Sequence, residues 1–481
     1  MNKQPAYQQA VVIGGSIAGL TAARVLTDHC ESVTIIERDI APTVSEFRKG
    51  VPQARHPHVL LKGGELVLEQ LFPGLRQELF DNGALPVNMG FEMEWFMGGQ
   101  WREKYVSPMV NIACSRPMLE STIHARLKAH PKVTFVQEAE AVGLLLDESK
   151  TRVAGIQTRS RRTHTISHIE ATIVVDASGR DSDTPRWLAE LGFPAPTETS
   201  VTSKPGYATR IYAIPEGFND TWKAIYIQPA APHDTRGGIA VAMEGNRWHV
   251  TIAGMAGDYP PTTEEGYLDF MRSLPDQRIY EAIKDARPLT PVWSFRRGEN
   301  RLRHYDKLSK YLEGFLVFGD AVYALNPVYG QGMTVAALGA MAMDKCLREQ
   351  QKTHAAGSLD GLAKHFQKQF ASVIAGPWQM ATGEDRRWNV DENVTPLSFP
   401  ARMMQNYIGK LLRVALTDKA VSEAFFQVQQ MIAPPTLFFR PDIFWKVITA
   451  RRATKKQAQP AKTGKNIAET QHPTALRPEA E

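Results

Sequence analysis

The chain opens with Val11-Val-Ile-Gly-Gly-Ser-Ile-Ala-Gly-Leu20, an apolar strand that runs into a glycine-rich turn and the first residues of a helix. A second apolar stretch, Thr34-Ile-Ile-Glu37, follows after this helix and ends in a carboxylate. A strand, a tight turn, a helix and a second strand that ends in an acidic residue form the layout of a dinucleotide-binding βαβ unit. The sequence therefore predicts a parallel α/β core built around a nucleotide site.

Individual positions in this unit have clear physical roles. Gly14 permits the sharp turn after the strand, and Gly19 lets the helix pack closely against it. The middle glycine of the usual pattern is replaced by Ser16, which is still small enough for the backbone to approach a phosphate. Glu37 lies 23 residues after Gly14, where a carboxylate can accept hydrogen bonds from a ribose diol. The helix N-terminus is then expected to face a pyrophosphate.

The composition is that of a globular protein. The chain has 481 residues, of which 43% are apolar and 22% are charged, and this length predicts two or three packed domains. No stretch approaches the run of about 18 apolar residues that predicts a membrane span. The first residues lack the apolar core of a signal peptide, so a cytoplasmic location is expected.

The net charge of +5 is concentrated at the C-terminus. Residues 451–481 contain seven Lys or Arg and three Glu, a balance of +4, and they show no apolar periodicity. This segment is expected to be a disordered basic tail. The rest of the chain is nearly neutral, which argues against nucleic-acid binding.

The three cysteines, Cys30, Cys114 and Cys346, lie far apart in the sequence. They form no C-x-x-C pair and no metal-ligand spacing. This pattern excludes enzymes that depend on a redox-active cysteine pair, and no metal site is predicted.

The later part of the chain predicts an inserted sheet and a helical C-terminal region. Short β-rich segments between residues 200 and 298 predict an antiparallel or mixed sheet inserted into a Rossmann-like α/β fold. A buried strand returns at 314–320, and helices are predicted from the following loop to Leu347 and at about 359–374, 400–417 and 422–432. The expected divisions are 1–199 (with part of the substrate region near 80–110), 200–298, 299–350, 351–450 and the tail 451–481.

Two distant motifs accompany the opening unit. Asp176-Ala-Ser-Gly-Arg-Asp-Ser182 directly follows a buried strand, and Gly319-Asp320 precedes Asn326-Pro-Val-Tyr-Gly-Gln-Gly-Met333. An aspartate at the end of a buried strand can hold a ligand hydroxyl. A Pro-x-x-Gly-x-Gly loop that runs into a helix offers backbone N–H groups to an anionic oxygen. Both motifs also have plainer interpretations, a helix cap and simple turns.

Together the three motifs resemble those of the class A FAD-dependent monooxygenases, which share the fold of para-hydroxybenzoate hydroxylase. More narrowly, Arg48-Lys-Gly-Val-Pro-Gln-Ala-Arg-His-Pro-His58 and Asn326-Pro-Val-Tyr-Gly330 are similar to segments of the bacterial FAD-dependent epoxidases of polyether biosynthesis. The resemblance covers about residues 8–350. It implies that the Rossmann-like domain binds FAD and that the inserted sheet contacts the substrate.

The resemblance also implies roles for residues at the nucleotide end of FAD. The turn would cradle the pyrophosphate, Glu37 would bind the adenosine ribose, and Arg38 would lie along the adenine. Asp176 and Gly179 would lie near the pyrophosphate, although Ala177 stands where many members have glycine. The turn residues implied are Gly14, Gly15, Ser16, Ile17, Ala18 and Gly19.

Further residues are implied at the flavin end. Arg116 would reach the phosphate or ribityl chain, and Asp320, after Gly319, would bind the ribityl chain. The residues that would border the isoalloxazine are Pro327, Gly330, Gly332 and Met333. A loop with Arg48, Arg55 and His58 would pass close to the flavin.

The chemistry implied by the resemblance is a single-component oxygenation. NADPH or NADH would reduce FAD, and dioxygen would form a C4a-hydroperoxyflavin whose distal oxygen passes to a lipophilic secondary metabolite. No catalytic acid or base stands out in the sequence, which favours epoxidation over phenol hydroxylation. Alternation along strands should turn about half of the candidate substrate residues away from the flavin. These candidates are Trp95, Phe96, Met97, Tyr207, Tyr212, Trp293, Phe295 and Tyr329.

Three alternatives remain open from the sequence. A flavin-dependent reductase or dehydrogenase of an isoprenoid-like or aromatic substrate shares this fold. A flavin-dependent halogenase does too, but none of the nine tryptophans forms its W-x-W signature. The amphipathic stretch Thr436–Ile448, followed by the basic tail, could also place the protein on an anionic membrane surface.

Overall fold

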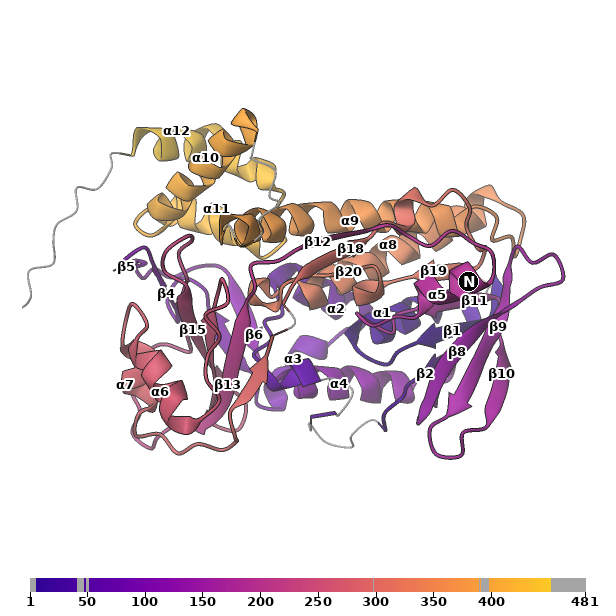
Figure 1. Cartoon of the computed structure of the whole chain (residues 1–481), viewed down its shortest axis with the longest axis horizontal. Coiled ribbons are helices and arrows are strands. Elements are labelled where there is room, and N and C mark those ends of the chain that lie inside the picture. Colours follow the sequence, from indigo (N-terminus) through magenta and orange to yellow (C-terminus); the bar gives the residue numbers. More distant parts are fainter. Residues whose placement is uncertain are drawn as a thin grey trace, which may run out of the picture.

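A parallel sheet of five strands lies at the centre of the computed structural model, which describes residues 6–40, 47–48, 52–296, 298–388, 390 and 398–450. The strand order is β19-β11-β1-β2-β7, and all neighbours run parallel (Figure 1). Residues Ala10 to Ile13 of β1 are all buried, as expected for a strand covered on both faces. The strands are β19 (Phe315–Val317), β11 (Ile173–Asp176), β1 (Tyr7–Ile13), β2 (Cys30–Ile36) and β7 (Val133–Val136).

Long helices pack over this sheet. α1 (Ile17–Leu26) connects β1 to β2 and packs against α8 (Gly332–Thr353), which in turn packs against α9 (Leu362–Asp385). Their apolar side chains join those of the sheet in one large buried cluster. The remaining helices of this half are α2 (Lys62–Leu71), α3 (Leu75–Asp81), α4 (Arg116–Lys128) and α5 (Thr184–Glu190).

A second, seven-stranded sheet has the order β17-β13-β16-β15-β14-β4-β5 (Figure 1). Its neighbours are antiparallel except β14 and β4, which run parallel. One face packs against α6 (Glu264–Arg272) and α7 (Arg278–Ile283) in an apolar cluster of its own. The strands are β17 (Trp293–Phe295), β13 (Gly206–Ala213), β16 (Arg247–Gly254), β15 (Arg236–Met243), β14 (Ala224–Ile227), β4 (Met93–Met97) and β5 (Gln100–Trp101).

The C-terminal region is helical, as predicted. It contains α10 (Phe399–Ala415), α11 (Lys419–Gln429) and α12 (Pro441–Thr449), which share a small core. The prediction that a helix ends near Ile374 is wrong, because α9 continues through Pro377 to Asp385. Proline removes one hydrogen bond from a helix interior, but packing of α9 against α8 outweighs this cost. The predicted α/β fold with an inserted mixed sheet and a helical C-terminal region is thus confirmed.

Three smaller sheets complete the strands. Strands β8, β9 and β10 form an antiparallel sheet that contacts the central sheet at β2 and β11. The strands of these sheets are β8 (Ala139–Leu146), β9 (Val153–Ser160), β10 (Ile166–Glu170), β12 (Glu198–Val201), β18 (Asn300–Arg303), β20 (Tyr323–Ala324), β3 (Leu85–Asn88) and β6 (Val110–Ala113).

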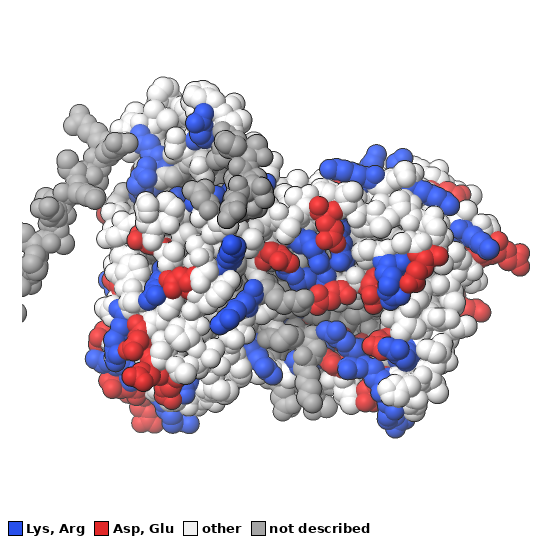
Figure 2. Space-filling model, viewed as in Figure 1, with Lys and Arg blue, Asp and Glu red and all other residues white. Residues whose placement is uncertain are grey.

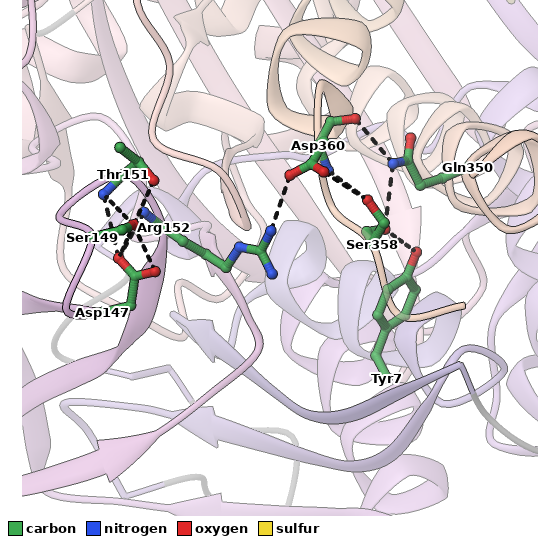
Figure 3. A network of polar contacts seen from close by, with 8 residues as sticks. All are labelled: Tyr7, Asp147, Ser149, Thr151, Arg152, Gln350, Ser358 and Asp360. Carbon is green, nitrogen blue, oxygen red and sulfur yellow. Dashed lines mark hydrogen bonds and ion pairs between the residues drawn. The ribbon is translucent and has the colours of Figure 1, made fainter. Parts of the chain in front are cut away.

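A polar network joins the β8–β9 turn to the connection between α8 and α9 (Figure 3). Asp147 accepts hydrogen bonds within its own turn, and the neighbouring Arg152 pairs with Asp360 at 3.0 Å. Gln350 at the end of α8 donates to the carbonyl oxygens of Ser358 and Asp360. These contacts fix the loop that leads into α9 against the β8–β9 turn.

Cys30 and Cys346 are buried and Cys114 is half-buried, and all three are free thiols. Within the described residues, no helix is both long enough and apolar enough to span a bilayer. The predicted basic tail, residues 451–481, lies outside the described part of the chain.

Candidate functional site

The turn after β1 has the close packing that its glycines predict. Gly14 has a φ of +105°, and a Cβ atom there would lie 2.5 Å from the carbonyl oxygen of Ala177. A Cβ atom on Gly19 would lie 1.7 Å from the carbonyl oxygen of Gly14. Helix α1 begins at Ile17 without a side-chain cap, so its first amides point out of the turn as an anion site requires.

Glu37, at the end of β2, holds this turn from the other side. Its Oε2 accepts the N–H of Gly15 at 2.8 Å, and its Oε1 accepts the N–H of Asp39 at 3.0 Å. Arg48 pairs with the same carboxylate at 3.3 Å, whereas the neighbouring Arg38 is exposed. Glu37 therefore lies beside the turn as predicted, but Gly15 donates its amide to this carboxylate.

A buried ion cluster supports the same turn. Glu120 on α4 accepts the hydroxyl of Ser16 and pairs with Arg116 at 3.1 Å and Arg48 at 2.8 Å. Arg116 Nη2 also donates to Ser16 Oγ at 2.7 Å. Burial alone would raise the pKa of Glu120, but the Arg116 and Arg48 guanidiniums lower it to about 2. The structure thus brings Arg48 and Arg116 to the turn, through a carboxylate that the sequence analysis did not single out.

His58 links this cluster to the seven-stranded sheet. Its Nε2 lies 2.9 Å from Arg116 Nη1, and because a guanidinium only donates, this nitrogen accepts. Nδ1 therefore carries the proton and donates to the carbonyl oxygen of His56 at 2.9 Å. Burial, helped by the positive charge of Arg116, lowers the pKa of His58 to about 3. His58 is neutral here, and its tautomer is fixed.

His56 and Arg55 contact the sheet itself. His56 Nδ1 lies 2.7 Å from the hydroxyl of Thr209 on β13, and His249 on β16 donates from Nε2 to the carbonyl oxygen of Arg55 at 2.8 Å. The Arg55 guanidinium lies over the ring of Trp293, 5.6 Å from its centroid. The predicted loop residues therefore lie between the turn and the sheet.

Asp176 uses its carboxylate within the chain. It accepts the N–H of Ser178 at 2.9 Å and the hydroxyls of Ser182 and Thr184 at 2.5 Å each. Gly179 has a φ of +93° in the same segment. This aspartate shapes the loop that backs onto Gly14, and the N-cap of the following helix α5 is Asp183 rather than Asp176.

Asp320 is different, because its carboxylate makes no hydrogen bond or ion pair to any described residue. It follows Gly319, where a Cβ atom would lie 2.7 Å from Ala18 of the turn. Burial raises the pKa of Asp320, and the positive charges of Arg116, Arg180 and Arg301 only partly offset this. A partly buried carboxylate without a partner fits a ligand that brings hydroxyl donors.

The loop after Asn326 enters helix α8 with unpaired polar atoms. Pro327–Tyr329 form a short 3-10 turn, Gly330 has a φ of +64°, and the loop passes Val59. Within the described residues, Gln331 Oε1 and Thr334 Oγ1 are buried without a hydrogen-bond partner. They lie at the N-terminus of α8, with Gly332 and Met333, where a partial negative charge on a ligand is stabilised.

A network around Asp385 holds this loop and was not predicted from the sequence. Asp385, at the end of α9, accepts Asn300 Nδ2 at 2.6 Å and Asn326 Nδ2 at 3.3 Å. It also accepts the hydroxyl of Tyr329 at 2.5 Å, and Tyr207 donates to Asn326 Oδ1. Burial raises the pKa of Asp385 even though these donors stabilise the carboxylate.

The substrate candidates fall on both faces of the seven-stranded sheet. Tyr207 stacks with Phe295 at 6.3 Å, and His56 lies 5.6 Å from Phe295, so these residues and Trp293 lie near the loop. Tyr212 and Phe96 pack instead in the cluster with α6 and α7. The structure does not bring these two together with Tyr207, because side chains alternate along strands.

Trp95 and Met97 form a third group. They share a buried cluster with side chains of α10 and α11, and Trp95 stacks on Phe425 at 5.1 Å. A cavity of about 320 Å³ lies between α9 and the segment after α11. Its lining includes none of the predicted site residues. The inward face of the sheet thus meets the loop at one end and the C-terminal helices at the other.

Comparison with known proteins agrees with this geometry. Residues 7–374 match a family described as an FAD binding domain. The Mycobacterium tuberculosis protein Rv3254 is 31% identical over 442 residues, which cover 87% of this chain and 88% of that protein.

Solved structures share the fold at low sequence identity. PqsL, a probable FAD-dependent monooxygenase from Pseudomonas aeruginosa, superimposes with a TM-score of 0.57 at 15% identity over 79% of this chain and 98% of its own. The flavin-dependent brominase Bmp2 gives a TM-score of 0.60 at 13% identity over 86% and 92% of the two chains. The chain is therefore a flavoprotein of the FAD binding domain family, with the fold found in FAD-dependent monooxygenases.

Proposed function

We propose that this flavoprotein is a single-component monooxygenase that epoxidises or hydroxylates a lipophilic substrate with NADPH or NADH as the reductant. The proposal rests on two neighbouring features. Asp320, beside the glycine turn, has no partner for its carboxylate among the described residues, and the loop Asn326–Gly330 is held by amide and hydroxyl hydrogen bonds. Such an arrangement suits a cofactor with a polyol chain and a planar ring. When bound and reduced, FAD supplies the activation of dioxygen, which delivers one oxygen atom to the substrate and the other to water.

Different residues of the chain would bind different parts of FAD. The amides of Ser16, Ile17, Ala18 and Gly19 would bind the pyrophosphate, and Glu37 with Arg38 would border the adenosine. Asp320 would accept a ribityl hydroxyl. Pro327, Gly330, Gly332 and Met333 would border the ring, with the N-terminus of α8 at its partly negative edge.

Side chains that face the ring would orient the substrate and exclude water rather than transfer protons. Tyr207 and Tyr329 are tied to Asn326 and Asp385, and burial raises the pKa of both phenols well above their usual range. Neither can serve as a base near neutral pH. The aromatic side chains Phe295 and Trp293 offer an apolar surface beside them, which favours a lipophilic substrate and epoxidation.

Two other reactions compete with this proposal. The fold of the brominase Bmp2 is similar, so a halogenase is one alternative, although the W-x-W pattern is absent from the sequence. A reductase or dehydrogenase would use the same FAD site. PqsL, a probable FAD-dependent monooxygenase, and the apolar residues near the loop favour oxygenation.

Rapid mixing of the reduced protein with dioxygen tests the proposal. The protein is purified with FAD, reduced anaerobically with NADPH or NADH, and mixed with ¹⁸O-labelled dioxygen and a panel of polyenes and phenols. We expect a transient flavin absorbance that decays faster with one substrate class, and a product that carries the label. A saturated product without label would assign the chain to the reductases, and a product brominated only when bromide is present would assign it to the halogenases.

A further inference from the structure

Large apolar side chains are exposed mainly in the C-terminal helices. The described residues contain thirteen exposed large hydrophobic side chains, and seven of them lie between residues 398 and 450. Phe399 is 66% exposed, Trp445 62% and Met403 59%. A cluster of this kind on one small unit marks an interaction surface rather than scattered exposure.

The segments that carry these side chains, α10, the turn Pro435–Phe439 and α12, pack together. Phe399, Met403 and Tyr407 are spaced by four residues and share one side of α10. Tyr407 stacks on Phe439 at 5.2 Å and on Phe444 at 5.8 Å, and Lys410 Nζ donates to the carbonyl oxygen of Ile448 at 2.7 Å. We use the name α10–α12 surface for the exposed side chains of Phe399, Met403, Met404, Phe439, Trp445 and Ile448.

The core of this unit does not need these residues. Ile443 and Val447 of α12 are fully buried and pack with Leu411 and Ala415 of α10. Trp445 and Ile448 lie on the other side of the same helix and face outward. Helices α10 and α12 lie at the top left of Figure 1, above the seven-stranded sheet and α11. A helix that buries Ile443 and Val447 and also exposes Trp445 and Ile448 suits contact with a second, external apolar phase.

The charge around the surface is positive. Residues 398–450 contain six Lys or Arg and three Asp or Glu, and two of the acids, Asp418 and Asp442, are paired with Lys446 and Arg440. Figure 2 shows basic side chains set in an uncharged surface where α10 and α12 lie. The sequence continues with Arg451-Arg-Ala-Thr-Lys-Lys456. A basic rim around exposed Trp, Phe and Met complements an anionic lipid headgroup layer.

We propose that the α10–α12 surface docks the protein on an anionic bilayer, with Trp445, Phe399 and Met403 inserted at the boundary of headgroups and acyl chains. The helices would lie along the membrane plane. The proposal does not depend on the reaction that the flavin site performs.

Vesicle sedimentation of the FAD-loaded full-length protein tests this docking. The vesicles consist of phosphatidylcholine with or without phosphatidylglycerol. We expect binding that is stronger with phosphatidylglycerol and weaker at high salt. The double variant Trp445→Ser/Ile448→Ser should bind at least about tenfold more weakly, because two apolar side chains no longer enter the lipid.

A matched control separates this effect from a general loss of apolar surface. Val106→Ser/Ile166→Ser changes two side chains that are 71% and 53% exposed elsewhere, and it should bind like the unchanged protein. Circular dichroism and FAD content confirm that both variants are folded. The proposal is overturned if the unchanged protein binds neither vesicle, or if the Trp445→Ser/Ile448→Ser variant binds as well as the unchanged protein, which would leave the basic tail as the binding element. A dimer that this variant breaks, without vesicle binding, would assign the surface to a second copy of the chain.

Discussion

At the Gly14–Gly19 turn, charged side chains hold the backbone in place, since Ser16 and two arginines converge on Glu120. At the Asn326–Gly330 loop, uncharged amides and hydroxyls converge on one carboxylate, Asp385. Both carboxyl groups are buried, but their neighbours offset the effect of burial on the pKa to different extents. The arginines lower the pKa of Glu120 to about 2, whereas the pKa of Asp385 stays raised.

This difference agrees with what each end of the proposed site would bind. A pyrophosphate carries fixed negative charge, which suits a turn surrounded by paired guanidiniums. A flavin ring changes its charge during a reaction, and neutral dipoles that are already oriented can stabilise such changes without carrying a full charge themselves. Asp320 follows Gly319 beside the turn, and its carboxylate has no hydrogen-bond or ion-pair partner among the described residues.

The largest expected effect comes from the turn. In Gly19→Val the new side chain would collide with the carbonyl oxygen of Gly14, because even a Cβ atom would approach it to 1.7 Å. We expect a loss of about 3 kcal/mol or more in the free energy of unfolding, and no FAD in the purified protein. Urea unfolding and the visible absorbance of the purified protein measure both.

Gly409→Ala in α10 is the control for this change, since a Cβ atom there meets nothing within 4 Å and no proline follows it. This variant should keep FAD and gain up to about 1 kcal/mol, because alanine favours a helix. Retention of FAD by Gly19→Val would mean that the turn is not the nucleotide site.

The next change separates cofactor binding from stability. Asp320→Ala removes a carboxylate without a partner in the described part of the chain, so the protein without FAD should be as stable as before or slightly more stable. Its affinity for FAD should fall by about 10- to 100-fold, the value of a lost hydrogen bond to a charged group. Quenching of FAD fluorescence and the melting temperature of the FAD-free protein give the two readouts. Unchanged FAD affinity would contradict the proposed ribityl site.

For the Asn326–Gly330 loop we expect the opposite pattern, a loss of stability with a smaller change in FAD affinity. Asp385→Asn places an amide N–H₂ group against donors from Asn300 or Asn326, and we expect a loss of about 1–3 kcal/mol in stability. FAD affinity should change less than in Asp320→Ala, while the visible spectrum of bound FAD should shift. Tyr329→Phe, which removes one of the donors, should show a smaller loss of stability. If Asp385→Asn lost FAD entirely with no loss of stability, the loop would not be held as described.

The smallest effect concerns the pH dependence contributed by His58. Its folded pKa of about 3 lies below its ordinary value of 6.5, so protons bind the unfolded chain first. The stability that its neutral form contributes is present above pH 6.5 and is lost as the pH falls toward 3. By pH 5 this loss reaches up to about 2 kcal/mol. His58→Gln should therefore lose less stability between pH 7 and 5 in urea unfolding, and an identical pH dependence would show that the fold does not lower the pKa of His58.

Local sequence motifs were enough to predict most of the fold. The glycine turn, the buried strand before Asp176 and the strand before Asp320 are each encoded within about ten residues, so periodicity and turn chemistry predict them. The place of Asp320 at the end of such a strand was predictable in the same way, but its lack of a partner among the described residues was not. Helix α9 was predicted to be too short because Pro377 is unfavourable locally and only its packing against α8 overrides that.

The contacts that were missed join residues far apart in the chain. Asp385, Asn300 and Asn326 have no shared local pattern, and only the tertiary fold brings them together. The same holds for Glu120, which meets Arg48 across 72 positions. Tyr207 and Tyr212 could not be assigned to faces from the sequence, because that requires knowing which layer covers each side of β13.

A crystal structure of the protein with bound FAD tests the proposed cofactor site. We expect the pyrophosphate at the amides of Ser16–Gly19, a ribityl hydroxyl on Asp320, and the ring beside Pro327–Gly330. A cofactor that leaves Asp320 without a contact, or a ring placed away from this loop, would contradict it.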